Sequence, residues 1–186
     1  MIIGICGSAS GSGKTTMAEE LLKALAKRAR GDFGAIKFTR TPVYTSVVTG
    51  GDTLLEEGKD TARMLGAGAR SVVWVRSPGG VELSEALSIA LQNLSGARPP
   101  LAGVIVEGNS AVELLKPDIV IFMSGPYFKN GAEAALRLAD VVYRPQGAHI
   151  PAAADAAKKD AVFCGDTGAC VAEVLRLIDE RGGKRP

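Results

Sequence analysis

"GSASGSGKTT", residues 7–16, follows the apolar run "MIIGIC" and leads directly into a stretch whose apolar residues recur at helical spacing. A glycine loop that joins a strand to a helix presents backbone N–H groups and a favourable dipole to a phosphate. This order predicts a P-loop. The strict pattern G-x-x-x-x-G-K-[ST] would place its first glycine at Ser8, whereas the glycine stands at Gly7. The sequence of strand, loop and helix still favours a nucleoside triphosphate as the ligand.

The loop residues are expected to share the contacts with that ligand. Gly11 and Gly13 permit close approach of the backbone, Lys14 can reach the β- and γ-phosphates, and the Thr15 hydroxyl can ligate Mg²⁺. Thr16 is placed to contact the α-phosphate. The nucleotide-binding residues expected from the loop are Ser10, Gly11, Ser12, Gly13, Lys14, Thr15 and Thr16.

A P-loop needs a second acidic group on the metal side, at the end of another buried strand. The stretch "LAGVIVEGN", residues 101–109, supplies Glu107 after an apolar run. A carboxylate at that position would otherwise be an unpaired charge at a sheet edge. We therefore predict Glu107 as a metal ligand with Thr15, and Glu107 with Lys14 as the catalytic groups.

Two further residues are candidates for the wall of the site. Lys37 ends the second apolar run, and Asp60 opens a helix in "EGKDTARM". Asp60 has an alternative interpretation as a charge that favours a helix N-terminus. We predict that both Lys37 and Asp60 take part in binding the nucleotide.

Short apolar runs alternate along the chain with longer segments of helical period, which is typical of a mostly parallel sheet. Runs such as "GVIV" and "SVVWV" lack polar alternation, so helices should cover both faces. Strands are predicted at 2–6, 34–38, 71–76, 103–107, 118–123, 141–143 and 161–164. Helices are predicted at 14–29, 82–94, 133–139 and 170–179. The fold class is α/β, a three-layer αβα P-loop NTPase fold, in one domain spanning residues 1–186.

The stretch 39–57 is long for a connection in an αβ fold. Loops of this length are often functional. A peripheral hairpin within "VYTSVVTG" is the alternative interpretation, and both are open at this point.

The amino-acid composition limits which binding partners and which cellular compartment we expect for the protein. The formal net charge of +2 gives no electrostatic case for nucleic acid or an anionic membrane surface. The 3 cysteines are an odd number without a CxxC pair, which indicates a reducing compartment. The apolar N-terminal run is too short for a signal peptide or a membrane span. We expect a cytoplasmic protein.

Taken in order, "SGSGKTT", "GAIKFTRT", "EGKDTARMLGAGA" and "GVIVEG" resemble the molybdopterin-guanine dinucleotide biosynthesis protein B (MobB-like) group of P-loop GTP-binding proteins. The likeness covers roughly the first two-thirds of the chain. It implies Mg²⁺-dependent GTP binding, a homodimer, and a supporting role beside a molybdopterin guanylyltransferase. It assigns Gly13, Lys14, Thr15 and Thr16 to the phosphates, Glu107 to the metal side, and Lys37 with Asp60 to the site wall.

The chain departs from that family at two places. Phe38, Thr39 and Arg40 stand where the family commonly has histidines, and "EGNS" stands where it commonly reads "EGFK". The second change removes a basic residue near the phosphates. The nucleotide site itself is unaffected.

Three functions fit these residues. The first is an accessory nucleotide-binding protein with slow hydrolysis of GTP, in molybdenum cofactor biosynthesis. The second is an ATP-dependent small-molecule kinase, in which Glu107 or Asp60 orients an acceptor hydroxyl and the segment 40–58 serves as a lid. Cations that could neutralise the transferred phosphoryl group are Arg40, Arg63 and Arg70. The third is a non-catalytic switch in which nucleotide orders the long loop.

Overall fold

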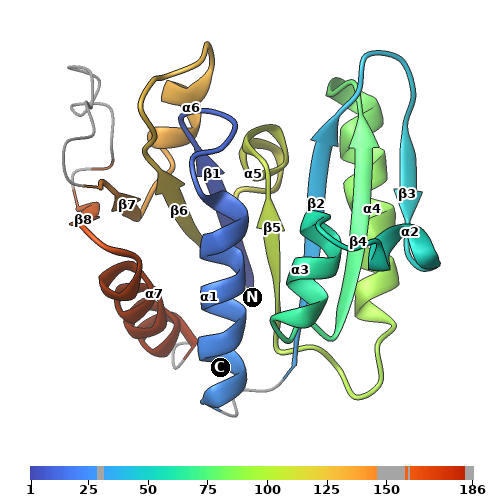
Figure 1. Cartoon of the computed structure of the whole chain (residues 1–186), viewed down its shortest axis with the longest axis horizontal. Helices are drawn as coiled ribbons and strands as arrows, with labels where there is room; N and C mark the ends of the chain where they lie inside the picture. Colours follow the sequence, from blue (N-terminus) through green and yellow to red (C-terminus); the bar gives the residue numbers. More distant parts are fainter. Residues whose placement is uncertain (29–31, 146–157, 159, 183–186) are drawn as a thin grey trace.

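The computed structural model describes residues 1–28, 32–145, 158 and 160–182. Within them, one eight-stranded sheet has the order β3-β4-β2-β5-β1-β6-β7-β8 (Figure 1). Neighbouring strands are parallel, except that β3 runs antiparallel to β4. The strands are β1 (Ile2–Gly7), β2 (Phe33–Arg40), β3 (Ser46–Val48), β4 (Ser71–Ser77), β5 (Gly103–Glu107), β6 (Ile119–Met123), β7 (Val141–Tyr143) and β8 (Val162–Cys164).

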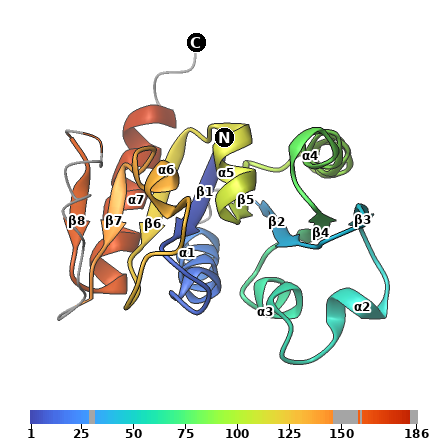
Figure 2. The ribbon, with the colours of Figure 1, turned by 90° about the horizontal axis from the view of Figure 1, so that it is seen from above.

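Helices cover both faces of this sheet, as Figure 2 shows from above. They are α1 (Lys14–Lys27), α2 (Asp52–Leu55), α3 (Asp60–Gly66), α4 (Gly80–Ser95), α5 (Asn109–Leu115), α6 (Ala132–Leu136) and α7 (Thr167–Gly182). The buried residues of α1, α3 and α7 share a core on one face, and those of α4, α5 and α6 pack on the other. The predicted three-layer arrangement with a mostly parallel sheet is confirmed. In the described part of the chain, no helix is long and apolar enough to cross a membrane.

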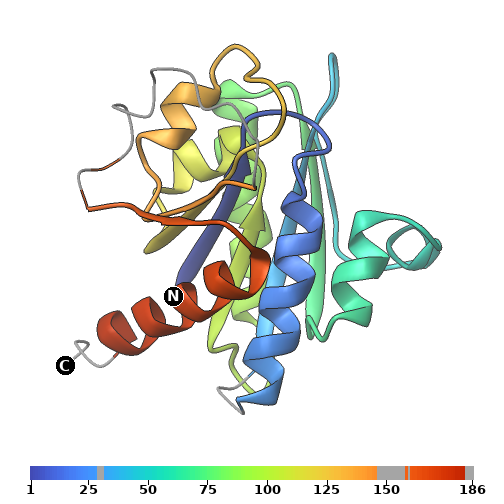
Figure 3. The same ribbon diagram turned by 60° about the vertical axis from the view of Figure 1, so that its left-hand side comes forward.

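The first core rests on the apolar stripe of α1. Met17, Leu21 and Leu25 recur every fourth residue, so they lie on one side of the helix, and each is at most 1% exposed. They pack in the same cluster as Ile3 of β1 and Val174 of α7. Figure 3 shows α1 in blue and α7 in red against this face. Burying such a side chain contributes about 1.5–3 kcal/mol, which fixes α1, and hence the loop before it, against the sheet.

The carboxyl ends of the central strands meet at one edge, at the top of Figure 1. Lys37 of β2 lies opposite Glu107 of β5, and Gly7 of β1 lies opposite Met123 of β6. In parallel αβ sheets this edge is where ligands bind. The register therefore brings residues far apart in sequence to one place.

Most predicted elements are present with boundaries shifted by a few residues, and three features differ. Helix α1 ends at Lys27, and the predicted end at residue 29 lies outside the described residues. Helix α5 was not predicted, because its buried residues Ala111 and Val112 are adjacent and do not repeat at helical spacing. The prediction of a hairpin within "VYTSVVTG" is wrong. Ser46–Val48 pairs instead with β4 at the sheet edge, and α2 follows it.

Candidate functional site

The loop after β1 is shaped by its glycines. Gly11 and Gly13 have φ of 73° and 85°, in the left-handed region that favours glycine. Gly13 is the N-cap of α1 without a side-chain cap, so N–H groups of the first turn remain available to a ligand. At Gly7, a Cβ would stand 2.5 Å from the Ser12 hydroxyl and 2.8 Å from the Met123 carbonyl oxygen. Close packing of the loop on β6 thus requires the glycine at position 7.

Lys14 curls back over this loop. Its Nζ donates to the carbonyl oxygen of Ala9 over 2.7 Å and to the hydroxyl of Ser12 over 3.3 Å. Burial, the largest cause, and the charge of Lys129 lower the pKa of Lys14, against the opposing effect of Glu107. The ammonium is therefore partly desolvated and without a full counter-charge, which favours an anion at the loop.

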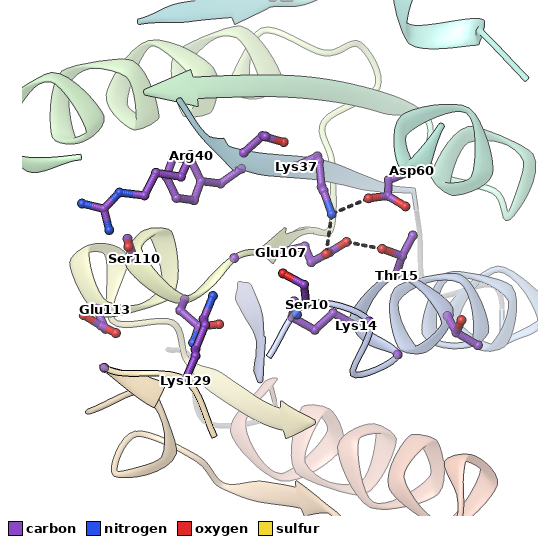
Figure 4. A pocket seen from close by; sticks show the side chains of 18 of the residues that line it. Ser10, Lys14, Thr15, Lys37, Arg40, Asp60, Glu107, Ser110, Glu113 and Lys129 are labelled. Carbon is purple, nitrogen blue, oxygen red and sulfur yellow. Dashed lines mark hydrogen bonds and ion pairs between the residues drawn. The ribbon is translucent and has the colours of Figure 1, made fainter. Parts of the chain in front are cut away.

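Thr15, Glu107, Lys37 and Asp60 form one connected network beside the loop (Figure 4). The Thr15 hydroxyl donates to Glu107 Oε2 over 2.9 Å. Lys37 Nζ lies 2.5 Å from Glu107 Oε1 and 2.6 Å from Asp60 Oδ2. Glu107 is 1% exposed, so this lysine supplies the counter-charge that a buried carboxylate requires. Burial tends to raise the pKa of Asp60, but the hydrogen bond and charge of Lys37 outweigh it and lower that pKa.

The donor set of this network fits a magnesium ion held with a phosphate. Thr15, Glu107 and Asp60 offer only oxygen atoms, which Mg²⁺ prefers. Across the described residues, no group of three or more His, Cys, Asp and Glu side chains forms a metal cage. Mg²⁺ characteristically takes one or two carboxylates together with substrate phosphates. Thr15 and Glu107 are the residues that would hold it.

A cavity of about 810 Å³ opens at this edge of the sheet and contains most of the predicted site. The predicted residues that line it are Ser10, Gly11, Gly13, Lys14, Thr15, Thr16, Lys37, Asp60 and Glu107. Ser12 is absent from this lining: it is 7% exposed and its hydroxyl accepts the bond from Lys14. Its side chain therefore supports the loop, and contact with a ligand is left to its backbone.

Of the three arginines that the kinase hypothesis places at the phosphates, two lie at the cavity and one does not. Arg40 and Arg63 line the cavity. Arg63 also donates to Glu19 over 2.7 Å and to the Thr16 hydroxyl over 3.3 Å. Arg70 is placed elsewhere, where it pairs with Asp32 and donates to a backbone carbonyl. Its expected role at the phosphates is therefore wrong.

Sequence reasoning missed a contact made by Asn109. Its side-chain oxygen accepts from Gly7 N over 3.0 Å, and its side-chain nitrogen donates to Gly7 O over 2.9 Å. This paired contact ties the start of α5 to the start of the P-loop. The sequence identifies position 109 only as a departure from the family pattern. That departure does not indicate which residue Asn109 contacts. Lys129 was also missed, because nothing in "FKNG" indicates that the segment folds back to line the cavity.

Comparison with solved structures places the fold among known ones. The crystal structure of HypB from Helicobacter pylori in complex with nickel matches with a TM-score of 0.60 and 15% identity, covering 100% of this chain and 89% of that one. At this identity the likeness shows the fold alone, and it agrees with the predicted α/β fold. No curated protein matches the chain significantly.

Comparison with protein families gives information beyond the fold. Residues 2–127 match the family described as molybdopterin guanine dinucleotide synthesis protein B. The matched region contains the P-loop, Lys37, Asp60 and Glu107, and it spans more than half of the sequence. The chain therefore belongs to the molybdopterin guanine dinucleotide synthesis protein B family.

Proposed function

We propose that this chain binds GTP with Mg²⁺ in the cavity at the carboxyl edge of the sheet, hydrolyses it slowly, and assists the attachment of a guanine nucleotide to the molybdenum cofactor. The convergence of Lys14, Thr15 and Glu107 on the P-loop carries the nucleotide part of this proposal. The choice of GTP and of the pathway rests on the family to which the chain belongs.

The chain's own groups can stabilise a transferring phosphoryl group by position and charge. The free N–H groups at the start of α1 point at the loop, and Lys14 can exchange its bond to Ala9 for one to a phosphate oxygen. Negative charge on the phosphates is spread over several oxygens in the transition state, so fixed donors and cations lower the barrier. When bound, Mg²⁺ supplies further neutralisation of the β- and γ-phosphates.

Glu107 would orient the attacking water. In the structure it accepts hydrogen bonds from Thr15 and Lys37, one on each carboxylate oxygen. Lys37 of β2 holds it in place, and Asp60 of α3 in turn positions that lysine. A carboxylate carries further lone pairs beyond these two contacts, so it can accept a hydrogen bond from water while it is still held.

The proposal is tested by measuring the affinity of the purified protein for GTP and for ATP, with and without Mg²⁺, and the release of phosphate. We expect GTP to bind more tightly than ATP, Mg²⁺ to strengthen binding, and phosphate to be released slowly. Absence of triphosphate binding would overturn the proposal. Preferential binding of ATP would overturn the choice of GTP.

A small-molecule kinase is the second candidate, and the placement of Arg40 and Arg63 in the cavity favours it. In that function Glu107 or Asp60 would orient an acceptor hydroxyl. The two candidates separate in one assay, because a kinase forms ADP faster when the acceptor is present, whereas the hydrolase does not need one.

We also propose, from family membership alone, a homodimer that acts beside a molybdopterin guanylyltransferase. Sedimentation of the purified protein tests the dimer. Co-elution of the two purified proteins, with and without Mg²⁺ and GTP, tests the partner.

A further inference from the structure

The cavity extends well beyond the groups that hold the phosphates and the metal. Figure 4 shows Thr15 and Asp60 on one side of Glu107, and Arg40 and Ser110 on the other. Glu113 and Lys129 line this second side too. A cavity of about 810 Å³ is near the upper end of the ~300–1,000 Å³ typical of small-molecule sites. We call the part bounded by Arg40, Ser110, Glu113 and Lys129 the distal half.

The geometry of β2 separates the distal half from the metal side. Successive side chains of a strand point to opposite faces of a sheet. Lys37 therefore points to the face that carries α1, together with the buried Phe33 and Ala35 of the same strand. Arg40, three residues after Lys37, points to the opposite face. Its Nη2 lies 3.7 Å from the position that a Cβ would take on Gly79, before α4.

Phe38 adds a physical divider. Its side chain comes within 3.0 Å of the position that a Cβ would take on Gly108, directly after Glu107. Phe38 also lines the cavity. A ligand oxygen held by Lys37 on one side of β2 is therefore separated from the Arg40 guanidinium by the strand and by this ring.

Apart from Lys14 at the P-loop, the cations of the two halves differ in their partners. Lys37 is paired with Glu107 and Asp60, and Arg63 with Glu19. Arg40 and Lys129, by contrast, have no ion pair with any acid in the described part of the chain, although both line the cavity. Two cations around a concave surface, neither of them in an ion pair within the described residues, favour an anionic group there.

Glu113 and Ser110 add a different chemistry to the same place. The Glu113 carboxylate accepts hydrogen bonds, and the Ser110 hydroxyl can donate or accept. Both are on α5, and both line the cavity. The distal half thus combines two cations, one carboxylate and one hydroxyl, which suits a small polar molecule with an anionic group and a hydrogen-bond donor.

We propose that the distal half binds a second small ligand beside the nucleotide, with a phosphate or carboxylate group on Arg40 and Lys129 and a hydroxyl or amino group on Glu113. This inference rests on the proposed function for the nucleotide itself. It makes Arg40 a determinant of the second ligand rather than of the triphosphate. Lys129 lies nearer to the P-loop, since its N–H donates to Ser8 O over 2.9 Å and its charge affects Lys14.

The test is a calorimetric titration of inorganic phosphate, and separately of acetate, into protein saturated with Mg²⁺ and a non-hydrolysable GTP analogue. Chloride at equal ionic strength is the reference. Phosphate is expected to bind the wild type, and acetate tests whether a carboxylate suffices. Arg40→Gln should raise the Kd for phosphate about tenfold or more, the scale of one charge-assisted hydrogen bond. Lys27→Gln, an exposed cation outside the cavity, is the matched control and should behave like the wild type.

Three results would overturn the distal site. These are no binding of either anion to the saturated wild type, unchanged phosphate binding in Arg40→Gln, or a loss of affinity for the GTP analogue in Arg40→Gln as large as in Lys14→Ala. If the GTP analogue does not bind the wild type, the proposed function fails by itself. Phosphate titrated into nucleotide-free Lys14→Ala protein, with and without Arg40→Gln, then still decides the role of Arg40.

Discussion

The hydroxyl of Thr15 donates a 2.9 Å hydrogen bond to the buried carboxylate of Glu107, across 92 positions of the chain. The bond joins the first turn of α1 to the end of β5, two elements whose buried residues share one core cluster. It sets side by side the two oxygen atoms that we propose as ligands of Mg²⁺. The same carboxylate is neutralised by Lys37, so a metal that binds there would also loosen the hold of Lys37 on Glu107.

Lys14→Ala is expected to weaken GTP binding by tenfold to a hundredfold, because one charge-assisted hydrogen bond contributes about 1.5–3 kcal/mol. Equilibrium titration with Mg²⁺ and GTP measures this. Since burial lowers the pKa of Lys14, its charged form is disfavoured in the folded protein without ligand. We therefore expect no loss of thermal stability in the nucleotide-free variant. A large loss would show that Lys14 serves the fold rather than the ligand.

Glu107→Gln is expected to reduce the Mg²⁺-dependent part of GTP affinity by about tenfold or more, the scale for disturbing a metal's coordination. The rate of phosphate release should fall with it. The amide keeps an oxygen that can accept from Thr15, and the charge pair with Lys37 is lost. Titrations with and without Mg²⁺, followed by single-turnover hydrolysis, give both quantities. Hydrolysis at the wild-type rate would remove Glu107 from the chemistry.

The sequence predicted the parts of this site that lie in continuous motifs. Gly13, Lys14 and Thr15 follow one another in the chain, and Glu107 ends an apolar run, so their common edge follows from the rule for parallel sheets. It could not predict the contact of Asn109 with Gly7, because that depends on how α5 starts relative to β1. A tertiary contact of this kind leaves no recognisable pattern in the local sequence.

The same limit explains other differences. The buried residues of helix α5 are adjacent, and strand β3 is half-buried at every position, so neither shows the periodicity of its element and packing decides whether they form. The side chain of Ser12 turns away from the cavity because Gly7 and Gly125 leave room for it against β6. A motif assigns a residue to the loop but does not say which way its side chain points.

Gly7→Ala is expected to destabilise the protein by about 1–3 kcal/mol, the range for overpacking in a tight interior. The added Cβ would stand 2.8 Å from a backbone oxygen of Met123, which cannot swing aside as a side chain can. Gly50→Ala is the matched control, since a Cβ there has nothing within 4 Å and the residue lacks a positive φ. Denaturant unfolding of both variants checks the difference. Equal stability would mean that the loop can shift away from β6.

Asp140→Asn tests an ion cluster at the opposite edge of the sheet. The variant should make the free energy of unfolding less dependent on pH in the acid range. Asp140 accepts from Val120 N over 2.8 Å, from Lys158 Nζ over 2.8 Å and from Arg181 Nη2 over 3.1 Å. Burial tends to raise its pKa, but the bonds from Arg181, Lys158 and Val120 outweigh this and lower the pKa. A lowered pKa in the folded state means that the stabilisation is present above the unfolded value of about 3.9 and is lost as pH falls through the folded value.

At pH 7 we therefore expect Asp140→Asn to lower the free energy of unfolding by about 1–3 kcal/mol, because charged hydrogen bonds are lost. The gap to the wild type should narrow below about pH 4, where the wild-type carboxylate also becomes protonated. Asp52→Asn is the control: this residue is exposed on α2 and has no ion pair within the described ranges, so its change should follow the wild-type pH curve. Urea unfolding at a series of pH values measures all three proteins. A gap for Asp140→Asn that stays constant from neutral to acid pH would show that the shape of the site, rather than its charge, stabilises this end of the sheet.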